Sequence, residues 1–184
     1  MLVAQPNFSD FVTEGTRCLG IKNRRIYFVL RSACCTFVYM NTTVISPTAC
    51  EASHYEAVCH LLGQLTTREV EFTMADYQQL ITAPCSRLFL LLCDDKVAGM
   101  LTVGMYLSPT GSKAWIEDVV VDEAYRGLGL GRELMVHAME HCKVEGIGTV
   151  YLTSNPRRVA ANALYQSMGF GRKETNMYRL ELKK

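Results

Sequence analysis

The sequence lacks the features that mark several common classes of protein. Its 184 residues carry 19 basic and 18 acidic side chains, and the formal net charge of +1 indicates no strongly charged partner. Two apolar runs near the N-terminus, Ile26 to Leu30 and Ala33 to Tyr39, are each much shorter than the roughly 18 residues of a membrane span. We therefore expect neither a nucleic acid nor a membrane as a partner.

The eight cysteines contain no C-x-x-C pair and no Cys/His spacing typical of a metal site. Several lie on predicted apolar faces, as buried free thiols do, so we expect a reducing, cytoplasmic environment. His137 and His141 stand four residues apart in a predicted helix. No Glu follows His137 and the sequence offers no third ligand, so we interpret the pair as ordinary helix residues and predict no metal.

Residues 1–39 differ from the remainder in composition and charge. They carry five basic and two acidic residues, a net +3, which leaves −2 for residues 40–184. The apolar part starts late and is interrupted, so it makes a poor signal peptide. We predict that residues 1–39 are an N-terminal extension outside the native domain, that Met40 is the natural start, and that residues 40–184 form the functional domain.

From Met40 onward, strand and helix patterns alternate in the order β-α-α-β-β-β-α-β-α-β-β. Thr48-Ala-Cys-Glu51 and Thr73-Met-Ala-Asp76 are predicted capping boxes at the start of two helices. The predicted strands are 42–45, 88–93, 97–107, 115–121, 149–153, 170–172 and 177–182, and the predicted helices are 48–65, 73–83, one after Gly131 that ends at Gly146, and 157–168. This alternation favours a single mixed α/β domain.

One stretch, Trp115 to Arg132, combines a β-branched strand with a glycine-rich turn that opens a helix. The first amides of a helix lack internal partners, so this turn is suited to a phosphate. Arg132 occupies the place of the third glycine of G-x-G-x-x-G, which excludes a dinucleotide fingerprint. The chain contains no Lys-Ser or Lys-Thr pair, which excludes a P-loop.

The remaining pattern, R-x-x-G-x-G after a hydrophobic strand, resembles the coenzyme A loop of the GNAT superfamily of N-acetyltransferases. A second stretch, Asn155-Pro-Arg-Arg158 followed by Asn162, Tyr165 and Gly169-Phe170, is similar to that family's second coenzyme A motif. The resemblance covers roughly residues 41–182. It implies a mostly antiparallel sheet of six to seven strands, splayed at the cofactor site and flanked by about four helices, with acetyl-coenzyme A (acetyl-CoA) as cofactor.

The resemblance also implies roles for individual residues. Attack of an amine on a thioester needs N–H donors for the oxyanion and a proton source for the departing thiolate. We expect Tyr165 to be the acid and Glu117 the general base, with Asp118 or a water chain as the alternatives to Glu117. The expected cofactor-binding residues are Val119, Val120, Val121, Arg126, Gly127, Leu128, Gly129, Leu130, Gly131, Arg132, Asn155, Asn162 and Tyr165.

The acceptor is expected near Leu65 to Phe72, the 108–114 loop and the C-terminal strands. These segments offer Arg68, Glu69, Glu71, Tyr106, Lys113 and Tyr178. We expect a small polar amine, with glucosamine 6-phosphate or a protein amine as alternatives and a homodimer among the possible assemblies. A regulator that binds coenzyme A without turnover would lack the acid, and a nucleotide-binding module would use the same anion site without thiol chemistry.

Overall fold

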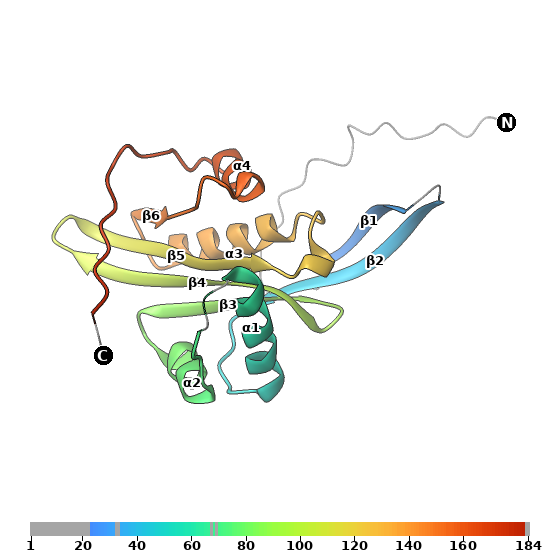
Figure 1. Cartoon of the computed structure of the whole chain (residues 1–184), viewed down its shortest axis with the longest axis horizontal. Coiled ribbons are helices and arrows are strands. Elements are labelled where there is room, and N and C mark those ends of the chain that lie inside the picture. Colours follow the sequence, from blue (N-terminus) through green and yellow to red (C-terminus); the bar gives the residue numbers. More distant parts are fainter. Residues whose placement is uncertain (1–22, 32–33, 67, 69, 183–184) are drawn as a thin grey trace.

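A six-stranded sheet runs through the computed structural model, which describes residues 23–31, 34–66, 68 and 70–182 (Figure 1). The strands are ordered β1 to β6 across the sheet, as they are along the chain. Neighbours from β1 to β5 pair antiparallel, and β5 and β6 pair parallel. The strands are β1 Asn23–Arg31, β2 Cys34–Ile45, β3 Ser86–Cys93, β4 Lys96–Ser108, β5 Gly111–Val121 and β6 Thr149–Leu152. The prediction of a mostly antiparallel sheet is confirmed.

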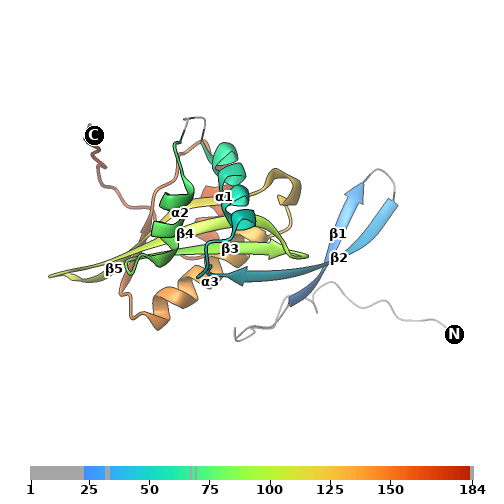
Figure 2. The same ribbon diagram turned by 90° about the horizontal axis from the view of Figure 1, so that it is seen from below.

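Helices cover both faces of this sheet (Figures 1 and 2). On one face, α1 (Ala52–Leu65) packs against β4 and β5, and α2 (Met74–Thr82) packs against β3. On the other face, α3 (Leu130–Val144) packs against β3, β4 and β5, and α4 (Val159–Ser167) follows β6. The short 3₁₀ helix η2 (Glu123–Tyr125) links β5 to α3. This arrangement agrees with the predicted mixed α/β fold with about four helices.

The middle of β3 is buried on both faces. Leu88 and Leu90 belong to the apolar cluster under α1 and α2, whereas Phe89 and Leu91 belong to the larger cluster under α3. Successive strand side chains point to opposite faces, so a continuous apolar run is what a strand between two helical layers requires. The predicted strand over 88–93 therefore divides the core into two layers.

The turn between β3 and β4 is formed by Asp94 and Asp95, which both have left-handed backbone angles (φ 45° and 66°). Two such residues in a row are typical of the tight turn that matches the twist of a hairpin. Within β4, Gly99 lies against β5, because a Cβ atom there would come within 2.9 Å of the Val120 carbonyl oxygen. The predicted strands 88–93 and 97–107 therefore form an antiparallel hairpin.

The two predicted capping boxes have different outcomes. At α2, the Thr73 hydroxyl accepts from the Asp76 amide, and the Asp76 carboxylate accepts from the Thr73 amide, as predicted. At α1 the prediction was wrong, because the helix starts at Ala52 with Glu51 as its N-cap and without a side-chain cap. The residues around Pro47 stay in non-helical conformations, so the helical turn that Thr48 was expected to open does not form.

The prediction of two strands at 170–172 and 177–182 was also wrong. Between residues 170 and 182, where the described chain ends, no residue has strand pairing, and Met177, Tyr178, Leu180 and Leu182 are exposed. Alternating apolar residues specify a strand only when a neighbouring strand edge pairs with them. The edge strand β6 is only four residues long and offers little edge for pairing.

The predicted N-terminal extension falls partly outside the described residues, because residues 1–22 are not described. Within the described part, β1 pairs with β2 along its length, and Met40 lies inside β2 with 6% of its surface exposed. The domain boundary at Met40 stays a prediction. Among the described residues, no helix is both long and apolar enough to cross a bilayer.

Candidate functional site

The strand β5 loses its partner on one side halfway along its length. Only Lys113 to Ile116 pair with β6, at Thr149 to Leu152, whereas β5 continues to Val121. The edge of β5 from Glu117 onward is therefore open toward α4. This is the splay between two parallel strands that the resemblance implied.

A β-bulge lies at the point where β5 and β6 separate. Thr102 pairs with Glu117 and Met100 pairs with Val120, so Asp118 and Val119 together face the single residue Leu101. Asp118, the first of these two residues, has a left-handed backbone (φ 54°), as the first residue of a G1 bulge does. Because the bulge interrupts strict alternation, Glu117, Asp118 and Val119 all line the same cleft.

The direction of the β5 amides beyond the bulge follows from one hydrogen bond. The Asp122 amide donates to the Ala98 carbonyl oxygen in β4 over 2.9 Å. Amides alternate along a strand, so Val120 also faces β4, whereas the amides of Val119 and Val121 face the open edge. The Val120 side chain, 7% exposed, packs in the cluster under α1. Of the three predicted valines, two therefore present amides to the cleft side.

The glycine-rich loop provides free amides at the start of α3. Gly129 is the N-cap of α3 with φ 73°, and its carbonyl oxygen accepts the first helical bonds, from Arg132 and Glu133. The amides of Leu130 and Gly131 precede these donors and face the helix end. A Cβ at Gly127 or Gly129 would meet no protein atom within 4 Å, so the space in front of the loop is open.

The side chains of this loop point elsewhere. Leu130 is 1% exposed and belongs to the larger core cluster under α3, and Leu128 packs against this cluster. A Cβ at Gly131 would be 3.4 Å from the Leu164 side chain, so this glycine permits contact between α3 and α4. Arg132 donates to the Ser167 hydroxyl. The loop therefore offers main-chain groups to a ligand, as a phosphate site at a helix start does.

Arg126, one of the expected cofactor-binding residues, is held by protein atoms. Its Nε donates to the Val121 carbonyl oxygen over 3.1 Å, and its Nη2 donates to the Gln64 Oε1 over 3.2 Å. Both contacts tie the loop to β5 and α1. The guanidinium thus positions the chain before the glycines.

The second motif forms the start of α4. Asn162 Nδ2 donates to the carbonyl oxygens of Asn155 and Arg158, each over 2.9 Å, and Asn155 Oδ1 accepts from the Arg157 amide. Asn155 closes the turn after β6, and Arg158 is the helix N-cap. Both predicted asparagines therefore stabilise the turn at the start of α4. The Nδ2 atom of Asn162 makes these hydrogen bonds, so its Oδ1 atom can accept one from a ligand.

Tyr165 lies on α4 and lines the cleft with 8% of its surface exposed. Its ring packs edge-on against Phe170, with ring centroids 6.2 Å apart. Burial raises the pKa of the Tyr165 hydroxyl, and the positive charge of Arg158 opposes this shift. The hydroxyl is therefore protonated at neutral pH, as a proton donor must be.

The cleft has a volume of about 1070 Å³ and opens between α1, the α1–α2 loop, β5 and α4. Glu117, Asp118, Val119 and Tyr165 come together in it. A neighbouring hollow of about 630 Å³ shares Thr153 and Arg158 with the cleft and contains Ser154, Asn155 and Arg157. Residues from α1 and the loop after it, from β5 and from α4 thus converge on the cleft.

The two β5 carboxylates of the cleft, Glu117 and Asp118, are electrostatically unusual. Both have accessible surface, yet protein atoms surround them in the hollow and reduce their solvation. This desolvation raises the pKa of Glu117, the nearby charge of Asp118 raises it further, and a hydrogen bond from Trp115 opposes both. Desolvation also raises the pKa of Asp118. A carboxylate with a raised pKa is a better proton acceptor near neutral pH.

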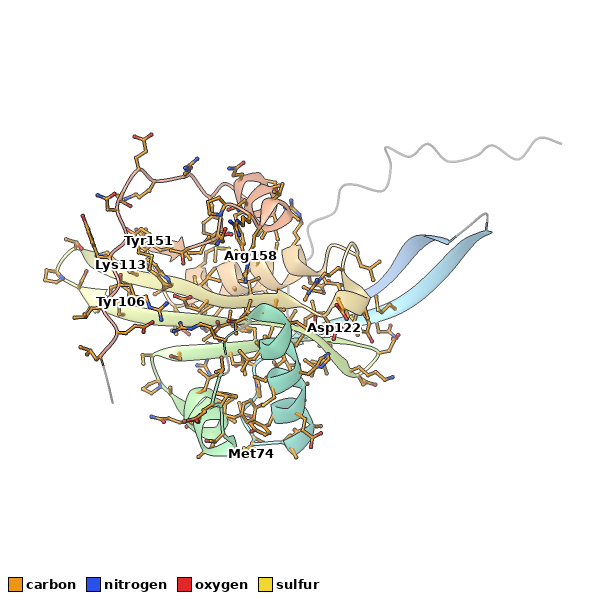
Figure 3. All side chains as sticks on the ribbon, in the orientation of Figure 1. Met74, Tyr106, Lys113, Asp122, Tyr151 and Arg158 are labelled. Carbon is orange, nitrogen blue, oxygen red and sulfur yellow. The ribbon has the colours of Figure 1, made fainter. Side chains whose placement is uncertain are left out.

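The expected acceptor residues are only partly brought together. Arg68 and Glu71 line the cleft, and Arg68 Nη2 forms an ion pair with Glu181 over 3.1 Å. Tyr106 and Lys113 lie near Tyr151 at the far end of the sheet, away from Arg158 (Figure 3), and do not line the cleft. Tyr178 is 87% exposed. Glu69 lies outside the described residues.

Sequence reasoning missed two residues of this region, Gln64 and Arg158. Arg158 lines both hollows, and its Nη2 donates to the Leu65 carbonyl oxygen at the end of α1 over 2.9 Å. Gln64 contacts the segment before the glycine loop. Both contacts span more than 50 residues, so local sequence patterns carry no signal for them. Among the described residues no group of three side chains could hold a metal ion, and His137 and His141 instead contact the Phe89 ring.

Comparison with known proteins agrees with this geometry. The sequence pattern of the Acetyltransferase (GNAT) family matches residues 55–170. A [Ribosomal protein bS18]-alanine N-acetyltransferase of Salmonella typhimurium is 31% identical over 80 residues, 44% of this chain and 51% of the relative. A glucosamine 6-phosphate N-acetyltransferase of Trypanosoma brucei brucei is 40% identical over 67 residues, 36% of this chain and 43% of the relative. The chain thus spans about half the length of these relatives.

Among solved structures, an aminoglycoside acetyltransferase from an uncultured soil metagenomic sample superposes with a TM-score of 0.68. It covers 77% of this chain and 97% of its own, and the 16% sequence identity makes this a likeness of fold. The family match spans well over half of the chain and contains the open β5 edge, the glycine loop and α4. On these grounds the chain belongs to the GNAT family of acetyltransferases, whose members use acetyl-CoA.

Proposed function

We propose that this protein transfers the acetyl group of acetyl-CoA to a primary amine by direct attack while both substrates are bound. The observation that carries the proposal is the open β5 edge after Ile116, which faces Tyr165 on α4. One cleft thus offers free main-chain donors, a proton donor and three carboxylates, two of them on β5. A regulator that only binds coenzyme A would need neither the proton donor nor the carboxylates.

The residues present fit acetyl-CoA. The amides at the start of α3 and the open space at Gly127 and Gly129 suit a pyrophosphate. The separated strands leave the Val121 amide of β5 for the polar pantetheine arm. When bound, acetyl-CoA supplies a thioester whose carbonyl carbon is open to attack by an amine.

Each group then has one task at a stated atom. The Val119 amide, at the bulge, donates to the carbonyl oxygen of the acetyl group as negative charge develops there. The Tyr165 hydroxyl gives its proton to the departing sulfur. Glu117 takes the proton of the attacking amine, directly or through a water molecule, and its raised pKa suits that task.

The charge of the cleft favours a cationic amine as acceptor. Three carboxylates, Glu71, Glu117 and Asp118, line it against two guanidinium groups, those of Arg68 and Arg158, and Arg68 is paired with Glu181. An alkylammonium group is attracted to such carboxylates before it loses its proton. We therefore propose a small polar amine as the acceptor. We also propose that the protein works in a reducing cytoplasm, the compartment suited to the buried free cysteines Cys93 and Cys142.

Two tests separate the alternatives. Thermal unfolding with acetyl-CoA, ATP or NAD is expected to show stabilisation by acetyl-CoA, because a ligand of the native state raises stability by mass action. Stabilisation by ATP alone would overturn the proposal. An amine panel with thiol detection then identifies the acceptor, and it should include glucosamine 6-phosphate, an aminoglycoside and a peptide that begins with alanine.

A further inference from the structure

The end of α1 is fastened to the segment that leads into the glycine loop. Gln64 is half-buried on the last turn of α1, whose neighbours Leu62 and Leu65 line the cleft. It reaches Asp122, Glu123 and Arg126, which connect β5 to the loop. Asp122 lies beside α1 in Figure 3. One side chain thus touches three residues of a segment about 60 positions away.

The amide orientation of Gln64 is fixed by its partners. Oε1 accepts from the Glu123 amide over 3.0 Å and from Arg126 Nη2 over 3.2 Å, and both partners can only donate. Nε2 donates to Asp122 Oδ2 over 3.1 Å, and a carboxylate can only accept. Nε2 also lies 2.9 Å from His60 Nε2, which in turn contacts Asp122 Oδ2 over 2.9 Å. A glutamine matches this set, with two donors at Oε1 and the Asp122 carboxylate and His60 at Nε2. Glutamate or alanine does not.

The contact with Arg126 extends this chain of bonds to the site. The same guanidinium donates from Nε to the Val121 carbonyl oxygen, on the open edge of β5. Gln64 therefore holds Arg126, and Arg126 holds the segment from β5 to Gly127 in one arrangement. This segment decides where the amides at the start of α3 point.

We propose that Gln64 is a positioning residue. From the last turn of α1, it holds the glycine loop in the geometry that binds the pyrophosphate. The inference rests on the proposed placement of the pyrophosphate at Gly127 to Gly131. Gln64 acts through the loop and does not touch the reacting atoms. Its removal should therefore weaken binding of a donor that has a pyrophosphate and spare the chemical step.

The test compares two donors in steady-state assays. Gln64→Ala is expected to raise the KM for acetyl-CoA and the Kd for CoA by about tenfold, the effect of losing one or two hydrogen bonds, with kcat nearly unchanged. S-acetyl-pantetheine lacks the pyrophosphate, so its KM should be the same for Gln64→Ala and the wild type. An equal rise in KM for both donors, or a fall in kcat alone, would overturn the inference.

A charge rescue adds a second line of evidence. Gln64→Glu places a carboxylate against Asp122 and should weaken CoA binding. Adding Asp122→Asn restores a donor opposite the introduced carboxylate and should recover most of the loss. Failure of Asp122→Asn to recover any binding would contradict the proposed pairing.

Two controls make the outcome readable. Gln79→Ala removes an exposed glutamine on α2 and should leave the melting temperature and both KM values unchanged. Gly129→Val tests the loop itself. If Gly129→Val still binds CoA, the proposed pyrophosphate site fails. If Gly129→Val loses CoA binding but Gln64→Ala binds CoA as tightly as the wild type, only the proposed role of Gln64 fails.

Discussion

Glu117 and Asp118 are consecutive residues of β5, and both carboxylates line the same cleft. In a regular strand, consecutive side chains point to opposite faces. The bulge at Asp118 and Val119 removes this restriction. The two carboxyl groups consequently influence each other, and the charge of Asp118 contributes to the raised pKa of Glu117.

Glu117→Gln should lower kcat by about 100-fold, because it removes the proposed general base. A base works only when deprotonated. Since the pKa of Glu117 is raised, the rate of the wild type should increase with pH across a range above that of an ordinary glutamate, and Glu117→Gln should lack this increase. Rates measured against pH with saturating acetyl-CoA check both points. Glu56→Gln, an exposed change on α1, is the control. An unaltered pH profile in Glu117→Gln would assign the base to Asp118 or to water.

Asp118→Asn should raise the melting temperature at pH 7. Burial raises the pKa of Asp118 in the folded state. Its contribution to stability is therefore complete below the unfolded pKa and is lost as the pH rises through the folded pKa. Asparagine also tolerates the left-handed backbone at this position. The gain should disappear near pH 3, where both states are protonated.

Asp95→Asn is the matched control for that variant. Asp95 also has a left-handed backbone, but it lies in the turn between β3 and β4 and does not line the cleft. Its replacement should change the melting temperature equally at pH 3 and pH 7. A pH-independent effect at Asp118 as well would show that the desolvated charge of Asp118 in the cleft is not the cause.

Tyr165→Phe should lower kcat by about 100-fold, since it removes the proposed proton donor to sulfur. The ring and its packing against Phe170 remain, so the Kd for acetyl-CoA should change by less than about twofold. Calorimetric titration and single-turnover rates separate the two effects. Tyr77→Phe removes another buried hydroxyl, in the cluster under α1 and α2, and should keep full activity. Unchanged turnover in Tyr165→Phe would remove its role as acid.

Gly129→Val should abolish binding of acetyl-CoA. The new side chain would enter the open space before the loop amides, and the positive φ of 73° adds roughly 1–3 kcal/mol of strain. Gly146→Val carries the same kind of strain at the opposite end of α3, where φ is 67° and no protein atom lies near. Both variants should melt at lower temperature, but only Gly129→Val should lose binding in titration calorimetry. Retained binding would place the phosphates elsewhere.

The sequence by itself determined most of the elements between Thr42 and Met168 and the chemistry that they carry. The apolar run at 88–93, the turn at Asp94 and Asp95, and the helix after Gly131 are local patterns, because backbone preference and periodicity act over a few residues. The same holds for the glycine loop. Its spacing excluded two nucleotide motifs and led to the family that the comparisons confirm.

Only the tertiary structure decided which strands pair, which side chains face the cleft and which distant residues form hydrogen bonds. The alternating residues at 177–182 predicted a strand, and the fold offers them no partner. Alternation allowed one of Glu117 and Asp118 to face the cleft, and the pairing of β5 with β4 places both there through a bulge. Gln64 and Arg158 gained their contacts from chain segments far away in sequence. Hydrogen-bond partners and burial are properties of neighbours in space, so no local pattern of residues encodes them.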